Sequence, residues 1–551
     1  MSNKFFSLVL HSHIPYVLAH GSWPHGMDWL YEASAESYLP LLRVCRRLQD
    51  EGISPGINIS FTPVLMEQLA NPAFRRELKQ YLGARIACAR EDRGHFGRTG
   101  AAAIHSLTFY WESWYEDLLR FFEDVCGEDI LAAYRSLQDD GQVEVLTSAA
   151  THGYLPLLSE DDSVRWQVRQ GARVYEKYFG RRPPGFWLPE CGYRPGYSWR
   201  APLGDRAPVD RAGLDEILKQ EGVGCFFVDS HLLRGGEAKG VYNERFPALK
   251  GLWDKFKDAY HPVEESVKSP YESYLAHPSG VPFLVRDEIS GTQVWSGRSG
   301  YPGDGRYLEF HKKHFPGGLR YWRVTSSAAG LGEKQPYEPA AAAERLEANA
   351  SHFVDQLEKS LGSRPQGGAI AALYDTELFG HWWFEGPEWL YLVLKKLSRS
   401  EVRPRTANGC LEALPPRQTV SLPEGSWGEG GFHWTWLNDD TSWIWDKIYL
   451  IEEDAVKLAN RPFPGKTRVL KQFSREKFLL ESSDWPFLIS TRSARDYAEN
   501  RAAEHFDRAR TLWDWLVRPE SLGPAEERLL EVWEQQDGIF SEVVSPDGSI
   551  I

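Results

Sequence analysis

The sequence lacks the features of proteins that bind zinc through thiolates, cross membranes or bind nucleic acids. Its six cysteines are scattered and form no CxxC pair, which argues against a zinc site or a disulfide framework. No apolar run reaches the roughly 18 residues of a membrane span, and the apolar start at residues 5–10 is too short for a signal peptide. The formal charge of −14 disfavours a nucleic-acid surface. We expect a cytoplasmic protein without cofactor, nucleic-acid partner or membrane partner.

Aromatic residues, by contrast, are abundant. The chain has 22 Trp, 24 Tyr and 27 Phe but only 3 Met. A chain of 551 residues can bury a large core, and we assign about half of the tryptophans to it. The other tryptophans stand beside polar loop residues, where flat rings can stack on a ligand.

Short apolar runs recur along the chain, and each ends in polar residues. They are residues 5–10, 142–146, 185–188, 224–228, 281–285 and 369–374, and helix-like stretches separate them. Strands alternating with helices indicate a parallel sheet. Because reactive side chains follow at least six strand ends, a β/α barrel is favoured over an open doubly wound sheet, which has a single ligand crevice.

The remaining patterns suggest two domains. We expect a catalytic barrel over residues 1–405, with a helical insertion at about 60–138 and a long loop at about 232–280. Between the first two apolar runs, residues 37–48, 63–82 and 113–137 have apolar positions at helical spacing, which is too much for one crossover. Residues 419–422 are a candidate last strand. Residues 406–551 are expected to be a mainly helical domain that contributes to the substrate groove.

Two acidic residues stand in aromatic-rich motifs directly after predicted strands. Glu190 lies in the sequence Gly185–Tyr193, and Asp375 lies in Ala369–Pro387, which also contains Glu377, His381 and two adjacent tryptophans. A single carboxylate at a strand end can simply cap the next helix. Two of them beside aromatic rings are typical of sugar cleavage, where one carboxyl attacks and the other donates a proton.

Histidines at strand ends offer a different chemistry. His11 and His13 could hold zinc if later residues such as His152 and His231 completed the ligand set, and the enzyme would then be a metal-dependent deacetylase or amidohydrolase. The alternatives are that these histidines hydrogen-bond sugar hydroxyls, or that they are structural.

A glycine-rich segment, residues 427–438, carries three tryptophans, and we interpret it as an exposed sugar-stacking platform. Asp484 stands beside another tryptophan in the C-terminal region, where it is either a site residue or a helix cap.

At these residues the chain resembles glycoside hydrolase family 57, and its branching members in particular. The similar motifs are His11–Pro15, Gly141–Val145 with His152, Trp187–Tyr193, Tyr374–Glu385 and Trp427–Asn438. The resemblance implies an α/β fold, an incomplete (β/α)7 barrel with an inserted helical subdomain and a C-terminal helical domain. It also implies α-1,4-glucan branching on amylose or a glycogen-type polymer, with no metal.

Carried over by position, Glu190 would be the nucleophile and Asp375 the general acid/base of a retaining double displacement. The residues expected to bind substrate are His11, His13, Trp23, Trp29, His152, His231, Tyr242, Trp295, Trp427, Trp436 and Asp484. Tyr242 would lie on a loop over the site. An α-amylase or a 4-α-glucanotransferase would share both carboxyls, and a non-catalytic glucan-binding protein would not need them. The oligomeric state stays open.

Overall fold

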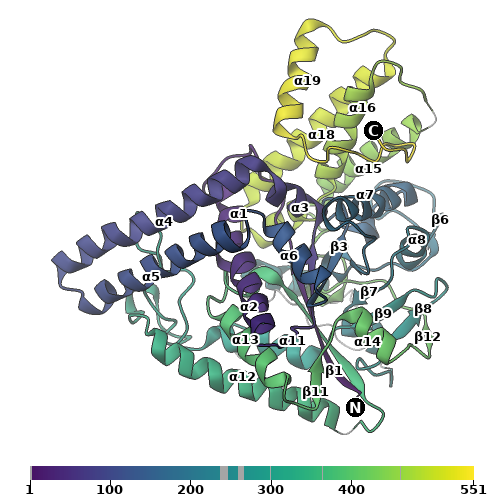
Figure 1. The fold of residues 1–551 in the computed structure, drawn as a ribbon. Helices are drawn as coiled ribbons and strands as arrows, with labels where there is room; N and C mark the ends of the chain where they lie inside the picture. The colour runs from purple at the N-terminus through teal and green to yellow at the C-terminus, as the bar shows by residue number, and fades with distance from the viewer. Residues whose placement is uncertain (1–2, 236–245, 258–265, 298–299, 363, 460) are drawn as a thin grey trace.

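The computed structural model describes residues 3–235, 246–257, 266–297, 300–362, 364–459 and 461–551. A sheet surrounded by helices forms the main body, and the last helices form a second lobe at the top of the view (Figure 1). The long helices α4 (Pro72–Thr99) and α5 (Ala102–Arg120) project from the body as a pair.

Seven parallel strands form the centre of the sheet. Their order is β10 (Gly368–Asp375), β1 (Lys4–Ser12), β2 (Ile57–Phe61), β3 (Val143–Ser148), β4 (Phe186–Trp187), β7 (Phe226–Val228) and β9 (Pro282–Val285). Among the residues that the structure describes, a single bridge joins the ends of the row, from Arg286 after β9 to Ala371 in β10. The Asp287 N–H donates to the Ala371 carbonyl there at 2.8 Å. The predicted incomplete (β/α)7 barrel is therefore confirmed.

Shorter strands extend this row. β8 (Tyr274–Ala276) runs antiparallel to β9, and β12 (Thr419–Val420) pairs with β8. The latter confirms the candidate last strand. β11 (Val402–Pro404) pairs with β1, and β5 (Tyr197–Trp199) with β6 (Val209–Arg211) forms a separate hairpin.

The sequence pattern missed strand β2. The sequence patterns indicate helices at 37–48 and 63–82 and no strand between them, whereas β2 lies there and takes its place between β1 and β3 in the barrel. Its residues Asn58 and Ser60 make it look polar, yet all five of its residues are buried. The Asn58 amide donates to the Leu8 carbonyl at 2.8 Å and accepts the Ala407 N–H at 2.9 Å. These bonds compensate for burying a polar side chain.

Helices surround the barrel strands. In chain order they are α1 (Met27–Ala33), a π-helix (Ser34–Tyr38), α2 (Leu39–Asp50), α3 (Pro63–Ala70), α6 (Ile130–Asp139), α7 (Asp161–Phe179), α8 (Leu214–Gln220), α9 (Ser230–Arg234), α10 (Pro247–Phe256), α11 (Glu288–Trp295), α12 (Pro339–Gly362), α13 (Gly386–Leu397) and α14 (Ala407–Ala413). Of these helices, α1 and α10 lie at the mouth of the barrel. Buried on both faces, barrel strands such as β1 and β10 are almost continuously apolar. Among the described residues, no helix combines the length and hydrophobicity that a membrane crossing requires.

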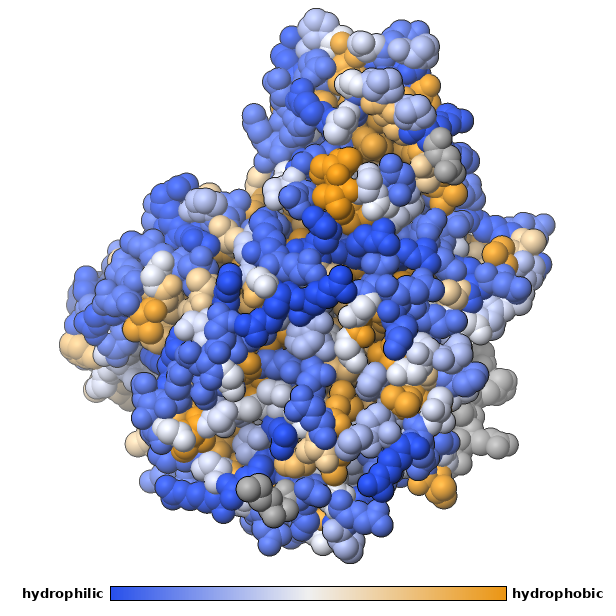
Figure 2. All heavy atoms as spheres, turned by 45° about the vertical axis from the view of Figure 1, so that its right-hand side comes forward, coloured by the Kyte–Doolittle hydropathy of each residue, from blue (hydrophilic) through white to orange (hydrophobic). Residues whose placement is uncertain are grey.

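Helices α15 (Ser442–Leu458), α16 (Thr467–Leu480), α17 (Asp484–Thr491), α18 (Arg495–Val517) and α19 (Pro524–Gln536) form the second lobe. The face in Figure 2 is largely hydrophilic, with hydrophobic side chains in small separate patches.

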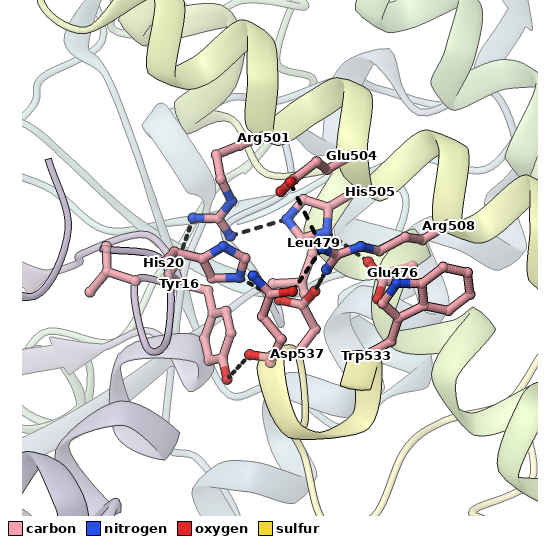
Figure 3. A network of polar contacts seen from close by, with 12 residues as sticks. Tyr16, His20, Glu476, Leu479, Arg501, Glu504, His505, Arg508, Trp533 and Asp537 are labelled. Carbon is pink, nitrogen blue, oxygen red and sulfur yellow. Dashed lines mark hydrogen bonds and ion pairs between the residues drawn. The ribbon is translucent and has the colours of Figure 1, made fainter. Parts of the chain in front are cut away.

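A buried ionic network fixes this lobe to the barrel (Figure 3). Asp537 accepts from His20, in the segment after β1, at 2.6 Å and pairs with Arg508 of α18. Arg501 donates to the Tyr16 carbonyl at 2.8 Å, and His505 contacts Glu476 at 2.7 Å. The network therefore links the segment after the first barrel strand to three elements of the lobe.

Candidate active site

A cavity of about 230 Å³ opens at the carboxyl ends of the barrel strands. It is lined by His11, His13, Ile14, Trp29, Ala33, His152, Glu190, Phe246, Asp375, Glu377, His381, Trp382, Trp427, Asp484, Phe487 and Leu488. Eight of the predicted site residues are in this set, and both predicted catalytic carboxyls are among them. The fold thus brings together two acids that are far apart in the sequence.

Glu190 is held in an unusual backbone conformation. Its φ of 59° and that of Cys191, 48°, lie in the left-handed region that few residues other than glycine adopt. Such strain persists only where the surrounding structure imposes it, and it is concentrated at functional sites. The turn after β4 leaves Glu190 only 8% exposed, at the cavity wall.

Trp427 fixes the Glu190 side chain. Its indole N–H donates to Glu190 Oε2 at 2.7 Å, and its backbone N–H donates to the Glu190 carbonyl at 3.1 Å. Residues 193 and 425 exchange two backbone hydrogen bonds, of 2.8 and 3.0 Å, so the two segments run side by side. Glu190 Oε1 lies 3.8 Å from His152 Nδ1.

Three histidines form a stacked group beside Glu190: His11 and His13 come from the end of β1, and His152 from the segment after β3. His11 Nε2 and His152 Nε2 lie 2.9 Å apart, and the rings of His13 and His152 stack with centroids 4.1 Å apart. Burial, with a smaller contribution from nearby His13, holds the pKa values of His11 and His152 well below the ordinary histidine range. Both are therefore neutral near pH 7 and can donate or accept hydrogen bonds.

The C-terminal lobe contributes Asp484 to the site. Asp484 Oδ2 accepts from His13 Nε2 at 2.8 Å and from Ser482 at 2.5 Å. Ser483 meets His152 Nδ1 at 2.9 Å. Burial alone would raise the pKa of Asp484, but the His13 imidazole and these hydrogen bonds bring it below its ordinary value. Asp484 is thus an ionised partner of His13.

The donor atoms of His13, His152 and Asp484 lie within 4.8 Å of one another and could hold a metal ion. However, His13 is hydrogen-bonded to Asp484, and His152 Nε2 to His11. A metal would have to replace both contacts, so the donor set fits a hydrogen-bonded cluster better than a ligand shell.

Glu377 is an acidic residue that the list of predicted site residues omitted. It follows Asp375 by two residues, and its Oε1 accepts from the Tyr38 hydroxyl at 2.5 Å and from the His13 N–H at 3.2 Å. Burial, and then the charge of Asp375, raise its pKa to about 8. Glu377 is consequently protonated at neutral pH. Its place in the Asp375 motif was the signal that could have identified it.

Apolar wall residues were also missed: Ile14, Phe246, Trp382, Phe487 and Leu488. Phe246 and Phe487 meet edge to face with ring centroids 5.5 Å apart. Ile14 and Trp382 stand in the His11–Pro15 and Tyr374–Glu385 motifs, which could have identified them, whereas Phe246 and Leu488 stand in no recognisable motif.

Four predicted substrate-binding residues do not line the cavity. Trp23 is 80% exposed on the segment before α1. His231 is buried between Asp229, at 3.2 Å, and the Gly431 carbonyl, at 3.0 Å. Trp295 packs behind Trp427 with ring centroids 5.9 Å apart, and Trp436 stacks on Tyr154 at 4.3 Å.

The prediction of an exposed platform at residues 427–438 was wrong for two of its three tryptophans, because Trp427 and Trp436 are at most 1% exposed. The glycines allow tight packing instead: a Cβ on Gly428 would approach the Trp436 ring to 2.6 Å. Tyr242 lies outside the described residues.

Comparisons with known proteins agree with this geometry. Residues 7–423 match the sequence profile of glycosyl hydrolase family 57, and residues 447–545 match the profile "1,4-alpha-glucan branching enzyme, C-terminal". The chain is 41% identical to the 1,4-alpha-glucan branching enzyme of Thermococcus kodakarensis, over 98% of this chain and 78% of that protein.

Solved structures of family 57 branching enzymes are also similar to this chain over nearly its full length. The crystal structure of the Thermococcus kodakarensis enzyme has a TM-score of 0.89 at 39% identity, covering 99% of this chain and 97% of that one. The branching enzyme of Pyrococcus horikoshii has a TM-score of 0.86 at 39% identity, covering 98% and 95%. The α-amylase AmyC of Thermotoga maritima has a TM-score of 0.80 at 29% identity, covering 99% of both chains.

Proposed function

The chain belongs to glycosyl hydrolase family 57, and from this membership and the geometry of the cavity we propose that it is a 1,4-alpha-glucan branching enzyme. It cleaves an α-1,4 linkage and transfers the released chain to a 6-hydroxyl, which creates an α-1,6 branch. The observation that carries the proposal is that Glu190 and Asp375, from two different strand ends, line one cavity with aromatic walls.

In the first step Glu190 attacks the anomeric carbon while Asp375 donates its proton to the glycosidic oxygen. The products are a covalent glucosyl-enzyme and a shortened chain. The Trp427 N–H, 2.7 Å from Oε2, orients the nucleophile. The second carboxyl oxygen, Oε1, faces His152 and is the attacking atom in this mechanism.

In the second step Asp375 accepts the proton of a 6-hydroxyl on another glucan chain, and that oxygen displaces Glu190 with overall retention. Transfer in place of hydrolysis requires that water be kept from the glucosyl-enzyme. The apolar side chains of Phe246, Phe487 and Leu488 provide such a wall.

The physiological substrate is accordingly an α-glucan such as amylose or a glycogen-type polymer. A second candidate, α-amylase activity, is favoured by the similarity to AmyC, which covers the full length of both chains. Both functions use the same two carboxyls and differ in the acceptor.

Incubation with amylose tests the proposal. Proton NMR should show new α-1,6 linkages with few new reducing ends, and Glu190→Gln and Asp375→Asn should each lower the rate by about 10³-fold or more. Reducing ends without branches would instead identify an amylase. Substantial residual transfer in Glu190→Gln would refute the assignment of the nucleophile.

A further inference from the structure

A second cavity lies outside the catalytic one, between helices α2 and α5, the first two turns of α12 and the segment that enters α13. Its volume is about 250 Å³, comparable to the roughly 230 Å³ of the catalytic cavity. It is therefore large enough for the kind of ligand that the catalytic cavity takes. The Glu36–His381 pair lies between the two, because Glu36 lines the second cavity, His381 lines the first, and their side chains meet at 2.7 Å.

Aromatic side chains form much of the wall of this second cavity. They are Tyr110, Trp114, Tyr337 and Phe384. Trp114 and Phe384 lie with ring centroids 5.6 Å apart and at 55° to each other, so they form an angled surface. Trp114 is only partly buried and presents a face on which a ligand can stack.

A buried carboxyl in this wall lacks part of its hydrogen bonding. Glu385 is 4% exposed, and its Oε1 accepts the Leu308 N–H at 2.9 Å. Its Oε2 makes no hydrogen bond of full geometry among the described residues, although the carboxyl also interacts with the Tyr337 hydroxyl of the same wall. Buried polar atoms are nearly always satisfied, so this oxygen marks a place where a bound group completes the site.

Charge pairing around the cavity indicates what kind of group that is. Glu36 is paired with Arg320 at 2.6 Å and Arg47 with Glu388 at 3.0 Å. Arg43 also lines the cavity, and in the part of the chain that the structure describes its guanidinium makes no side-chain hydrogen bond or ion pair, although the charges of Asp117 and Glu388 act on it. One carboxyl and one guanidinium remain for a ligand. An anion would face three glutamates, whereas a neutral polyol can bind both remaining groups.

We propose that this cavity is a second α-glucan site, which binds a glucosyl unit of a maltooligosaccharide against Trp114 with its hydroxyls on Glu385 and Arg43. The choice of α-glucan, among neutral sugars, rests on the proposed function. The site would hold a remote part of a long substrate and would take no part in bond cleavage.

Calorimetric titration with maltotetraose tests this proposal. The Glu190→Gln protein, which should not turn over the ligand, is expected to show two binding sites. Adding Trp114→Ala should abolish one site or weaken it about tenfold or more, and Glu385→Gln should weaken the same site. Phe109→Ala is the matched control, because Phe109 is also on α5 but is 49% exposed and does not line the cavity.

Hydrogen exchange provides a second readout that places the ligand. Maltotetraose should protect residues 107–117 and 384–390 in the Glu190→Gln protein, and Trp114→Ala should remove that protection while leaving protection near residues 427–436. A single site that Trp114→Ala does not affect would refute the proposal, as would protection confined to the catalytic cavity.

The branching assay separates this proposal from the proposed function. Branch formation together with a single, Trp114-independent site would refute only the second site. A Trp114-dependent site in a protein that forms no α-1,6 linkages would support the second site and refute the branching function.

Discussion

Replacing Glu377 by Gln should stabilise the protein, and the gain should grow with pH. Glu377 is buried, and its pKa is raised from an ordinary 4.5 to about 8, by burial first and by Asp375 second. The folded protein therefore holds this proton over a pH range in which the unfolded chain has released it. Stability is highest below pH 4.5 and is lost as the pH rises towards 8.

The magnitude follows from this shift. At 1.36 kcal/mol per pKa unit, the loss from Glu377 is about 1 kcal/mol at pH 5, about 3 kcal/mol at pH 7 and nearly 5 kcal/mol at pH 9. Gln does not titrate, and its carbonyl can accept from the Tyr38 hydroxyl and the His13 N–H as Glu377 Oε1 does. The advantage of the variant should thus increase by about 4 kcal/mol between pH 5 and pH 9.

Guanidinium denaturation of the two proteins at pH 5, 7 and 9, followed by tryptophan fluorescence, measures this difference. Glu344→Gln is the control, because Glu344 is 80% exposed and its nearest cation is 3.9 Å away. A gap between Glu377→Gln and the wild type that does not change with pH would refute the reasoning. Branching at pH 7 should fall less than about tenfold, since Glu377 is itself protonated there.

Three further predictions concern individual contacts. Trp427→Phe removes the 2.7 Å hydrogen bond to Glu190 and should lower kcat about 10- to 100-fold, as a charged hydrogen bond is worth about 1.5–3 kcal/mol; an unchanged kcat in steady-state kinetics on amylose would contradict this role. Asp537→Asn removes the buried charged partner of Arg508 and His20, and it should lower the free energy of unfolding by about 3–5 kcal/mol in denaturant titrations. The control Asp117→Asn, in an exposed pair with Arg120, should lower it by less than about 1 kcal/mol. Prolonged dialysis against EDTA should leave the branching rate unchanged, because His13 and His152 bond to Asp484 and His11; loss of activity restored by zinc would reopen the deacetylase interpretation.

The sequence predicts the barrel well where strands are apolar on both faces. The runs at β1 and β10 are of this kind, and their position before His11 and Asp375 locates the site at the strand ends. β2 escapes prediction because Asn58 and Ser60 are polar while their hydrogen bonds are made to residues distant in the sequence. Sequence periodicity uses only residues that are close along the chain. It therefore cannot identify a buried polar side chain whose hydrogen bonds are made to a distant backbone group.

The same limit explains why the exposure of the tryptophans in the 427–438 segment was predicted wrongly. Glycines beside aromatic rings suggested exposure, but at Gly428 the missing side chain instead lets the Trp436 ring pack closely against the backbone in the core. Trp427 then reaches Glu190 only because residues 193 and 425 pair. Whether a tryptophan stacks on sugar, orients a carboxyl or fills the core depends on such pairing, which its sequence neighbours do not specify.

Asp484 shows how the lobe after the barrel becomes part of the active site. The lobe could have been a separate binding module, yet Asp484 bonds His13 and Ser483 bonds His152, so the histidine wall is completed by residues at the start of α17. The buried network around Asp537 holds the lobe to the segment that follows these histidines. Weakening that network should therefore displace Asp484 as well as lower stability. If the branching rate of the Asp537→Asn variant falls at temperatures well below its unfolding transition, the coupling is supported. If the rate is unchanged up to that transition, the lobe holds Asp484 in place without the buried network.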